Sequence, residues 1–254
     1  MNKSLSQAEL AATERPFTIG EFETAKHAGR RPGYYAALDQ IASMGYQPAD
    51  LIHHFPAFTG NLTLIRYLTL YEMYKKAQGL AGHIAEVGVD MGASSLLFAK
   101  LIQTFEPDAL TMVHGFDWFQ GYRAAEDDVL LKDGAASEPE ARVRELVKIQ
   151  GLDNILKIHT LDVTKDMDAF FTKHPHLRFK LLYLDSGTYP VTLAAIKALW
   201  PRLLPGGIMV LDQYNNEVGP GEVRAVSELL PDYKVETLNN SWYPNAFIQK
   251  PFAK

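Results

Sequence analysis

A glycine-rich turn at residues 86–95 has the residue types and the spacing to bind a ligand through a carboxylate or a phosphate. The segment reads EVGVDMGASS and joins an apolar run that predicts a strand (83–89) to a run that predicts a helix (93–105). Glycines let the backbone approach a ligand closely, and a helix N-terminus offers unpaired N–H groups. The candidate ligand-binding residues are Glu86, Gly88, Gly92 and Ser94. A structural turn without a ligand is the alternative.

Four further acidic residues follow or end apolar runs that predict strands. They are Asp117, Asp162, Asp185 and Asp212. Ligands of open α/β sheets bind at the edge where the carboxyl ends of the parallel strands meet, so we expect these carboxylates to lie near the glycine turn. Ordinary solvated strand ends and, for Asp162, a helix N-cap are the alternatives.

Strands and helices alternate along the chain. Apolar runs predict strands at 83–89, 110–116, 155–161, 180–185, 208–214, 233–238 and 246–250. Helices are expected from Asn61 until Gly79 and at 93–105, 138–150, 165–173, 192–203 (ended by Pro205-Gly206-Gly207) and 222–230. This alternation predicts an α/β fold with a Rossmann-like, seven-stranded, mostly parallel sheet and helices on both faces. The last two strands have no helix between them, so we expect an antiparallel hairpin.

The composition of the chain excludes several classes of protein. Its 254 residues are 47% hydrophobic and 22% charged, which is ordinary for a folded soluble protein. A net charge of −5 argues against a broad nucleic-acid surface. The lack of cysteine excludes disulfides, thiolate nucleophiles and Cys-ligated metals. No secretory signal and no apolar run of membrane-spanning length are present, so we expect a cytoplasmic protein.

The glycine turn resembles the first motif of class I S-adenosylmethionine (SAM)-dependent methyltransferases. It differs from the G-x-G-x-x-G spacing of nicotinamide-dependent dehydrogenases. The resemblance implies that SAM is the cofactor, that the glycine loop holds its methionine portion, and that Asp117 holds the ribose hydroxyls. It also implies that Asp162 and Val163 contact the adenine. Trp118 is a candidate to stack beside the adenosine or to close the acceptor cleft, with packing as the alternative. Asp185 completes the residues assigned to the cofactor.

A closer resemblance runs from about Asn61 to Lys250. In order, IAEVGVDMGASS, FDWFQGY and LLYLDSGTYPVTLAAIKALWPRLLPGGIMVLDQY are similar to the macrocin O-methyltransferase family, whose members methylate sugar hydroxyls of natural products. That family carries Asp-x-Asp-x-Tyr after its fourth strand and Asp-Asp-Tyr after its fifth, and these carboxylates bind magnesium. The matching residues here are Asp185, Gly187, Tyr189, Asp212, Gln213 and Tyr214. The resemblance therefore implies Asp185, Asp212 and Gln213 as magnesium ligands, with two of the four carboxylates replaced.

Transfer of a methyl group to a sugar hydroxyl benefits from a proton acceptor. The candidates are Asp185, at the sheet edge, and His54, in a segment before the core that is expected to fold over the site. A surface or packing role is the alternative for His54. Three basic residues are candidates for the diphosphate of a nucleotide-sugar, or else solvated surface residues: Arg66, Arg123 and Lys132.

These features together predict a SAM-dependent O-methyltransferase that acts on a sugar hydroxyl of a natural product or nucleotide-sugar. Residues 1–80 are expected to form an N-terminal arm and helical lid, and residues 81–254 the SAM-binding methyltransferase domain. We expect a sugar-containing small molecule as partner, no nucleic acid and no membrane, with a homo-oligomer as a candidate assembly. Two alternatives stay open: a non-catalytic SAM-binding protein of the same fold, favoured by the two missing carboxylates, and a Rossmann oxidoreductase.

Overall fold

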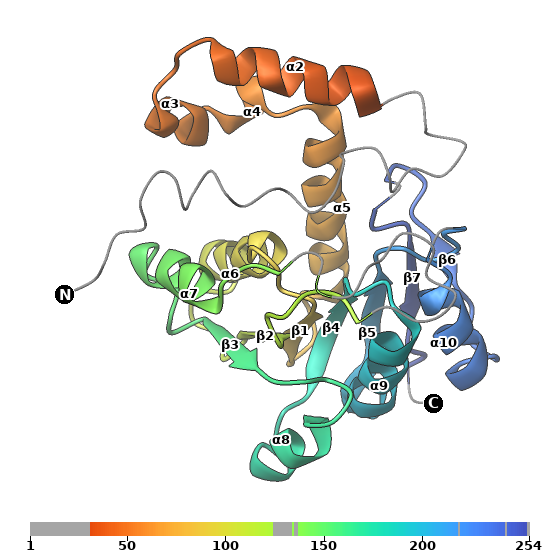
Figure 1. The fold of residues 1–254 in the computed structure, drawn as a ribbon. Coiled ribbons are helices and arrows are strands. Elements are labelled where there is room, and N and C mark those ends of the chain that lie inside the picture. The colour runs from red at the N-terminus through yellow and green to blue at the C-terminus, as the bar shows by residue number, and fades with distance from the viewer. Residues whose placement is uncertain (1–30, 124–133, 135–136, 218, 242, 253–254) are drawn as a thin grey trace.

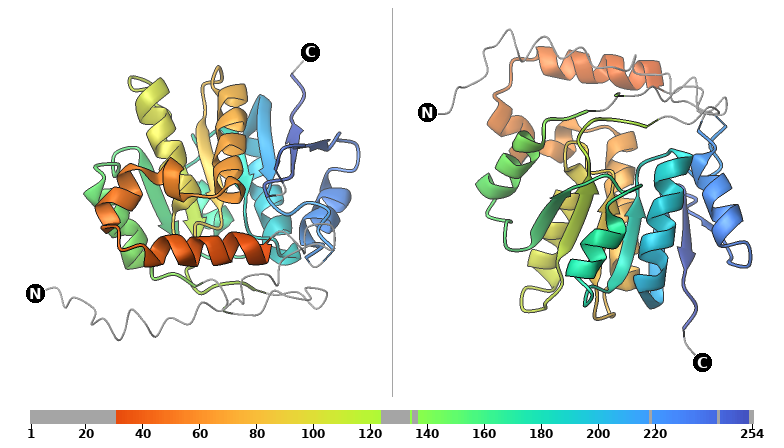
Figure 2. Two further views of the ribbon diagram at one scale, coloured as in Figure 1. Left: turned by 90° about the horizontal axis from the view of Figure 1, so that it is seen from above. Right: turned by 60° about the horizontal axis from the view of Figure 1, so that its bottom comes forward.

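The computed structural model describes residues 31–123, 134, 137–217, 219–241 and 243–252. Most of the predicted N-terminal arm, and also Lys132, lie outside these residues. Within the described part of the chain, helices pack against both faces of a seven-stranded sheet, as the sequence predicts (Figures 1 and 2). No helix in these ranges is both long and apolar enough to cross a membrane.

The sheet is parallel on one side and antiparallel on the other, in the order β3-β2-β1-β4-β5-β7-β6. The strands are β1 (His83–Val87), β2 (Val113–Asp117), β3 (Leu156–Thr160), β4 (Phe179–Leu184), β5 (Leu203–Leu211), β6 (Glu236–Thr237) and β7 (Ala246–Gln249). The first five pair in parallel, and the predicted antiparallel hairpin is present, with β7 lying between β5 and β6. The chain runs outward from β1 to β3 and then returns to β4 on the other side of β1. This reversal creates a switch point between β1 and β4, the place where open α/β sheets bind ligands.

The two faces of the sheet are covered by different sets of helices. The helices are α2 (Arg31–Ser43), α3 (Pro48–His53), α4 (Phe55–Phe58), α5 (Asn61–Ala77), α6 (Ala93–Phe105), α7 (Glu140–Ile149), α8 (Met167–Lys173), α9 (Tyr189–Leu199) and α10 (Gly221–Leu229), with a 3-10 turn at Trp200–Arg202. Side chains alternate along a strand. Ile84 and Tyr183 therefore pack with α5, α6 and α7, whereas Ala85 and Leu184 pack on the opposite face with α8, α9 and α10.

Helix α5 is part of the core and also reaches the edge of the sheet where the strands end. Its buried stripe consists of Leu70, Met73, Tyr74 and Ala77, which pack against the sheet and α6. Because a helix has 3.6 residues per turn, Arg66 lies on the same stripe, one turn before Leu70. The stripe thus continues from the core to the carboxyl ends of β4 and β5.

Helices α2, α3 and α4 are the part of the predicted lid that lies outside the core. These helices lie beyond the carboxyl edge of the sheet, above the first turns of α5 (Figure 1). A hydrogen bond between the hydroxyls of Tyr34 and Thr63 ties α2 to α5. Helix α5, by contrast, packs on the sheet itself.

The structure differs from the sequence prediction at the end of α9. The helix ends at Leu199 rather than at residue 203, because Pro201 cannot donate a helical backbone hydrogen bond and a 3-10 turn follows. Pro205-Gly206-Gly207 does not end the helix. It lies inside β5, where the register between β4 and β5 shifts.

A buried histidine and a half-buried histidine from neighbouring strands lie side by side in the sheet. His114 Nδ1 in β2 and His159 Nε2 in β3 are 2.9 Å apart, and the two rings are stacked. Burial, together with the nearby histidines, lowers the pKa of His114 to about 3 and that of His159 to about 4. Both side chains are therefore neutral in the folded protein near pH 7.

This histidine pair should make the fold sensitive to acid. A histidine with a folded pKa below its unfolded value of about 6.5 binds more protons when unfolded, so stability falls as the pH drops below about 6.5. We expect His159→Phe, with its ring among Phe116 and Phe170, to lose less Tm between pH 7 and pH 5 than the wild type. The exposed His53→Phe is the control and should behave as the wild type. Equal acid sensitivity of all three proteins would contradict this account.

Candidate active site

A cavity opens at the carboxyl edge of the sheet, at the switch point between β1 and β4. It measures about 750 Å³ including the open solvent at its mouth. Six of the nine residues that the sequence assigned to the cofactor lie on its walls: Gly88, Asp117, Trp118, Asp162, Val163 and Asp185. The structure thus brings together residues that are up to 97 positions apart in the chain.

The other three assigned residues lie behind the turn rather than on the cavity wall. Glu86 is fully buried and accepts a hydrogen bond from the Ser95 hydroxyl, and its burial raises the pKa of Glu86 to about 8. Ser94 is buried in the first turn of α6. Gly92 faces Val143 of α7, because a Cβ at Gly92 would lie 3.0 Å from a methyl group of that valine. These residues support the turn from the protein side.

Gly88 lies where two strand ends come closest. Its φ is +91°, and a Cβ at this position would lie 2.2 Å from the carbonyl oxygen of Asp185. The positive φ favours glycine, and the close approach of the neighbouring strand end excludes a side chain. Glycine is therefore required at this position by the protein's own packing, in addition to any close approach of a ligand.

Asp117 fixes the glycine turn to the end of β2. Its Oδ2 accepts the backbone N–H groups of Val89 at 2.7 Å and Asp90 at 3.1 Å, and its Oδ1 accepts that of Phe119 at 2.7 Å. The carboxylate still faces the cavity. A carboxylate oxygen accepts more than one hydrogen bond, so Asp117 retains capacity for a ligand hydroxyl.

Asp162 lies on the cavity wall just after the end of β3, where a basic and aromatic cluster holds it. Arg123 donates two hydrogen bonds to it, of 3.0 and 2.8 Å, and Thr164 donates from its backbone N–H and hydroxyl. Although burial opposes the effect, these bonds hold the pKa of Asp162 well below its usual range. The Arg123 guanidinium lies 4.3 Å from the centre of the Trp118 ring. The cluster gives this part of the cavity wall a fixed carboxylate beside an aromatic face.

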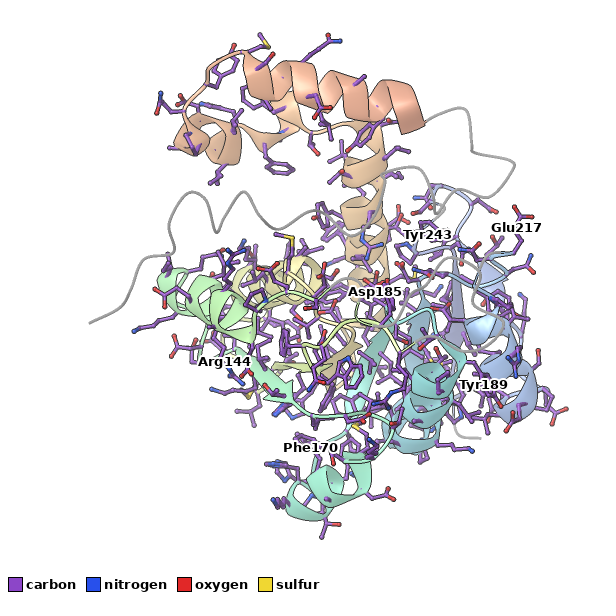
Figure 3. All side chains as sticks on the ribbon, viewed as in Figure 1. Arg144, Phe170, Asp185, Tyr189, Glu217 and Tyr243 are labelled. Carbon is purple, nitrogen blue, oxygen red and sulfur yellow. The ribbon has the colours of Figure 1, made fainter. Side chains whose placement is uncertain are left out.

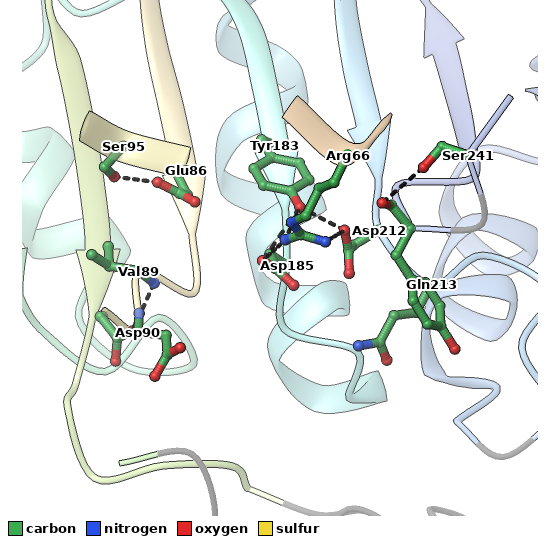
Figure 4. Close-up of polar contacts among 12 residues, drawn as sticks. Arg66, Glu86, Val89, Asp90, Ser95, Tyr183, Asp185, Asp212, Gln213 and Ser241 are labelled. Carbon is green, nitrogen blue, oxygen red and sulfur yellow. Dashed lines mark hydrogen bonds and ion pairs between the residues drawn. The ribbon is translucent and has the colours of Figure 1, made fainter. Parts of the chain in front are cut away.

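A second cluster, formed by Arg66, Tyr183, Asp185 and Asp212, lies at the ends of β4 and β5 (Figure 4). Arg66 Nη1 donates to Asp212 Oδ1 at 2.7 Å, and Nη2 donates to Asp185 Oδ2 at 2.6 Å and to the Tyr183 hydroxyl at 2.5 Å. The Tyr183 hydroxyl in turn donates to Asp212 Oδ1 at 2.5 Å. We call these four residues the Arg66 cluster. In it, one guanidinium bridges two carboxylates.

Strand alternation explains why these residues meet. Tyr183 packs on the face of the sheet that α5 covers, and Asp185, two residues later, continues on that side. On the neighbouring strand β5, Val210 packs on the same face as Tyr183, and Asp212, two residues later, continues on that side. The buried stripe of α5 brings Arg66 to the same point. Figure 3 shows Asp185 at the sheet edge that faces α2–α4.

The Arg66 cluster is only partly accessible to solvent. Asp212 is 3% exposed, whereas about a quarter of the Arg66 side chain and a fifth of the Asp185 side chain are exposed, at 24% and 22%. Burial and the charge of Asp212 raise the pKa of Asp185 to about 8, although Arg66 opposes the shift. A carboxylate with a pKa near neutrality, at the wall of the cavity, is suited to accept a proton.

The donor set at the ends of β4 and β5 departs from what a magnesium ion requires. Such an ion takes six oxygen ligands at close range. Here Asp185 and Asp212 already bind a guanidinium, Gly187 supplies no side chain, and the Gln213 side chain points away from Arg66 in Figure 4. Within the residues that the structure describes, no group of three or more acidic, His or Cys side chains is placed to hold a metal ion.

Two other sequence expectations fall elsewhere in the structure. His54 is exposed between α3 and α4 with its ring against His53, 4.6 Å between ring centres, and it is not part of the cavity wall. Arg66 and Arg123, considered for a diphosphate, instead bind carboxylates of the site. Sequence reasoning missed Tyr183 altogether. The sequence carries one signal for Arg66: it lies on the helical stripe of α5 whose next turn is buried.

The fold and this edge site define a Rossmann-like methyltransferase. Residues 85–214, more than half of the chain, match the family described as a methyltransferase domain. The chain belongs to that family. The matched segment contains the glycine turn at residues 86–95, the Asp117 carboxylate and the other acids at the strand ends.

The individual proteins that this chain resembles are only distantly similar to it in sequence. The 8-demethyl-8-(2,3-dimethoxy-alpha-L-rhamnosyl)-tetracenomycin-C 4'-O-methyltransferase of Streptomyces olivaceus is 27% identical over 151 residues, which are 54% of this chain and 55% of the relative. The aligned segment thus spans about half the length of that enzyme. CalS11, a calicheamicin methyltransferase, has a TM-score of 0.77 at 21% identity, covering 86% of this chain and 93% of its own. The O-methyltransferase NovP has a TM-score of 0.61 at 18% identity, covering 74% and 80%. At such identities the likeness to the solved structures concerns the fold.

The packing at Gly88 gives a stability prediction. Gly88→Ala should lower the free energy of unfolding by about 3 kcal/mol or more, since it combines a positive φ with a collision against the Asp185 carbonyl. Gly151→Ala is the matched control, because Gly151 has a φ of +65° and no atom within 4 Å of its Cβ position. It should cost only about 1–2 kcal/mol. Urea unfolding measures both, and equal costs would contradict the packing role of Gly88.

Proposed function

We propose that this chain transfers a methyl group from SAM to a hydroxyl oxygen of a sugar, carried by a natural product or a nucleotide. One observation carries the proposal. Asp185 lies on the wall of the cavity and is also a member of the Arg66 cluster, so the cavity and a polar cluster share one carboxylate. A cofactor in the cavity and an acceptor at the cluster would meet at this residue.

The chemistry of the cavity wall supports a nucleoside cofactor. The wall combines apolar side chains, such as Phe116 and Val163, with the carboxylates of Asp117 and Asp162. Apolar walls with a few placed polar groups are typical of small-molecule and cofactor sites. We assign Asp117 to the ribose hydroxyls and Asp162, with Trp118, to the adenine. When bound, SAM supplies an electrophilic methyl group whose C–S bond electrons leave with the sulfur.

The residues of the chain then have three tasks. Asp185 accepts the proton of the acceptor hydroxyl while that oxygen forms its bond to the methyl carbon. The Arg66 cluster fixes the position of Asp185, and the turn at Gly88 fixes the cofactor beside it, which supplies the alignment that an in-line displacement needs. Helices α2–α4, beyond the sheet edge, limit the access of water to the site.

The choice of a sugar as acceptor draws on relatives. The Streptomyces olivaceus enzyme is named as a 4'-O-methyltransferase of a rhamnosyl group, and CalS11 is named as a TDP-rhamnose 3'-O-methyltransferase of calicheamicin biosynthesis. These names support a deoxysugar hydroxyl as the acceptor of this chain. The test is methyl transfer from labelled SAM to a panel of rhamnosylated natural products, nucleotide-linked deoxysugars and catechols. Preference for the catechols would refute the sugar assignment, and no transfer to any acceptor would favour a non-catalytic protein.

Asp117 provides a test of the cofactor site. Asp117→Asn removes the charge while keeping one carbonyl oxygen for the turn, so SAM affinity should fall by about 10- to 150-fold, equivalent to roughly 1.5–3 kcal/mol. The control is Asp153→Asn, an exposed aspartate near the start of β3, which should bind SAM as the wild type does. Titration calorimetry measures the affinities. Unchanged affinity in a folded Asp117→Asn protein would contradict the assignment.

Asp185 provides a test of the proton acceptor. Only the ionised carboxylate accepts a proton, and its pKa is raised to about 8, so kcat/KM of the wild type should rise with pH up to about 8 and then level. Asp185→Asn should lower kcat by about 10²- to 10⁴-fold and remove this rise. A pH series of initial rates checks both expectations. A variant that keeps the wild-type pH profile would show that another group accepts the proton.

A further inference from the structure

We propose that the guanidinium of Arg66 takes the place of a divalent cation between Asp185 and Asp212, and that the chain performs its reaction without a metal ion. The inference rests on the methyl transfer proposed above and concerns the acceptor side of the same site. It departs from the magnesium site that the sequence resemblance implies. The contacts of Arg66, its charge and its remaining hydrogen-bond donors support it.

The contacts fix the guanidinium firmly. Arg66 makes three hydrogen bonds of 2.5 to 2.7 Å within the cluster, two of them to carboxylates that come from different strands. Its Cα lies on the buried stripe of α5, whose later turns are anchored in the core. Charge-assisted hydrogen bonds of this length are among the strong ones in proteins. The guanidinium therefore has a fixed position in the site.

The charge of the cluster leaves little to attract a second cation. Two carboxylates bring two negative charges at most, and Arg66 neutralises one of them permanently, because an arginine does not lose its proton in a protein. A divalent ion would have to displace the guanidinium or lie beside it. Gly187 and Gln213, where the resembling family has carboxylates, remove the charge that would offset this repulsion. Magnesium commonly binds through one or two carboxylates, but both carboxylates of this site already bind the guanidinium.

The guanidinium keeps donors for a substrate. Of its five N–H groups, three bind Asp185, Asp212 and Tyr183, and the side chain remains 24% exposed. The remaining N–H groups, on Nε and Nη1, are available for the oxygen of an acceptor hydroxyl. A cation at that oxygen favours the loss of its proton to Asp185 and stabilises the negative charge that develops on it during transfer. Arg66 therefore does for the acceptor what a bound cation would do.

The first experiment needs neither a variant nor an acceptor. Wild-type protein is titrated with Mn²⁺ and the free ion is followed by electron paramagnetic resonance. We expect no saturable site tighter than about 1 mM, a binding free energy of roughly 4 kcal/mol. One site per chain that binds Mn²⁺ more tightly and is lost in Asp185→Asn would overturn the proposal. The result does not depend on the identity of the acceptor, so a wrong sugar assignment leaves this test intact.

The second experiment measures methyl transfer by variants of Arg66, with the acceptor identified in the panel described above. Methyl transfer by the wild type should be unchanged by EDTA and by added Mg²⁺. Arg66→Met should lower kcat/KM for the acceptor by about 10²-fold, with partial recovery in Arg66→Lys, which keeps the positive charge. SAM affinity should be unchanged in both, because Arg66 does not line the cofactor cavity. Tm should fall in Arg66→Met in either case, because the two carboxylates lose their partner. A purely structural role would weaken SAM binding along with kcat/KM.

The control is Arg202→Met, at the opposite edge of the sheet, where Arg202 stacks on Phe171 at 3.9 Å and takes no part in the site. It should keep wild-type kcat/KM. Loss of activity on addition of EDTA, with recovery by Mg²⁺, would overturn the proposal, and so would wild-type activity in Arg66→Met. Absence of methyl transfer to every acceptor would refute the proposed function, whereas the Mn²⁺ titration would still decide the question of the metal.

Discussion

Two carboxylates at the ends of adjacent parallel strands repel each other, and the guanidinium of Arg66 is what holds them together. Asp185 and Asp212 are positioned by β4 and β5, and neither strand end can move without displacing the sheet register. The guanidinium satisfies both acids and the Tyr183 hydroxyl at once. Breaking a buried ion pair by removing one partner typically costs about 3–5 kcal/mol, because the remaining charge is left uncompensated. The chemistry proposed for Asp185 depends on this interaction.

The same residues hold the fold together and line the site. Gly88 has no side chain because the carbonyl of Asp185 lies against it, so the glycine turn and the end of β4 form one contact. Asp117 holds the glycine turn through Oδ2 and the backbone after β2 through Oδ1, and it also faces the cavity. The residues that we assign to the cofactor and to the acceptor are therefore coupled through the backbone of the sheet edge. Rigidity of this kind is what precise alignment of a displacement reaction requires.

Helix α5 connects the hydrophobic core to the Arg66 cluster. Its C-terminal turns contribute buried side chains such as Leu70 and Tyr74, and its N-terminal half presents Arg66 and then leads back to α2–α4. A helix is stiff over this length, so burial at one end fixes the guanidinium at the other. The segment expected as a lid thus consists of a core helix and a separate group of three shorter helices beyond the sheet edge.

The sequence alone determined the order of strands and helices, the closing hairpin and the glycine turn. These features depend on local patterns: apolar runs, helical spacing and glycines at a strand–helix junction. The sequence also indicated Asp117, Asp162 and Asp185, because strand ends in a parallel sheet share one edge. Tertiary structure decided what these acids contact. Arg66 is 119 residues away from Asp185 in the chain, and no local pattern gives a pairing over that separation. Only the packing of α5 on β4 and β5 brings the guanidinium to the strand ends, where the sequence pattern had suggested a metal ion.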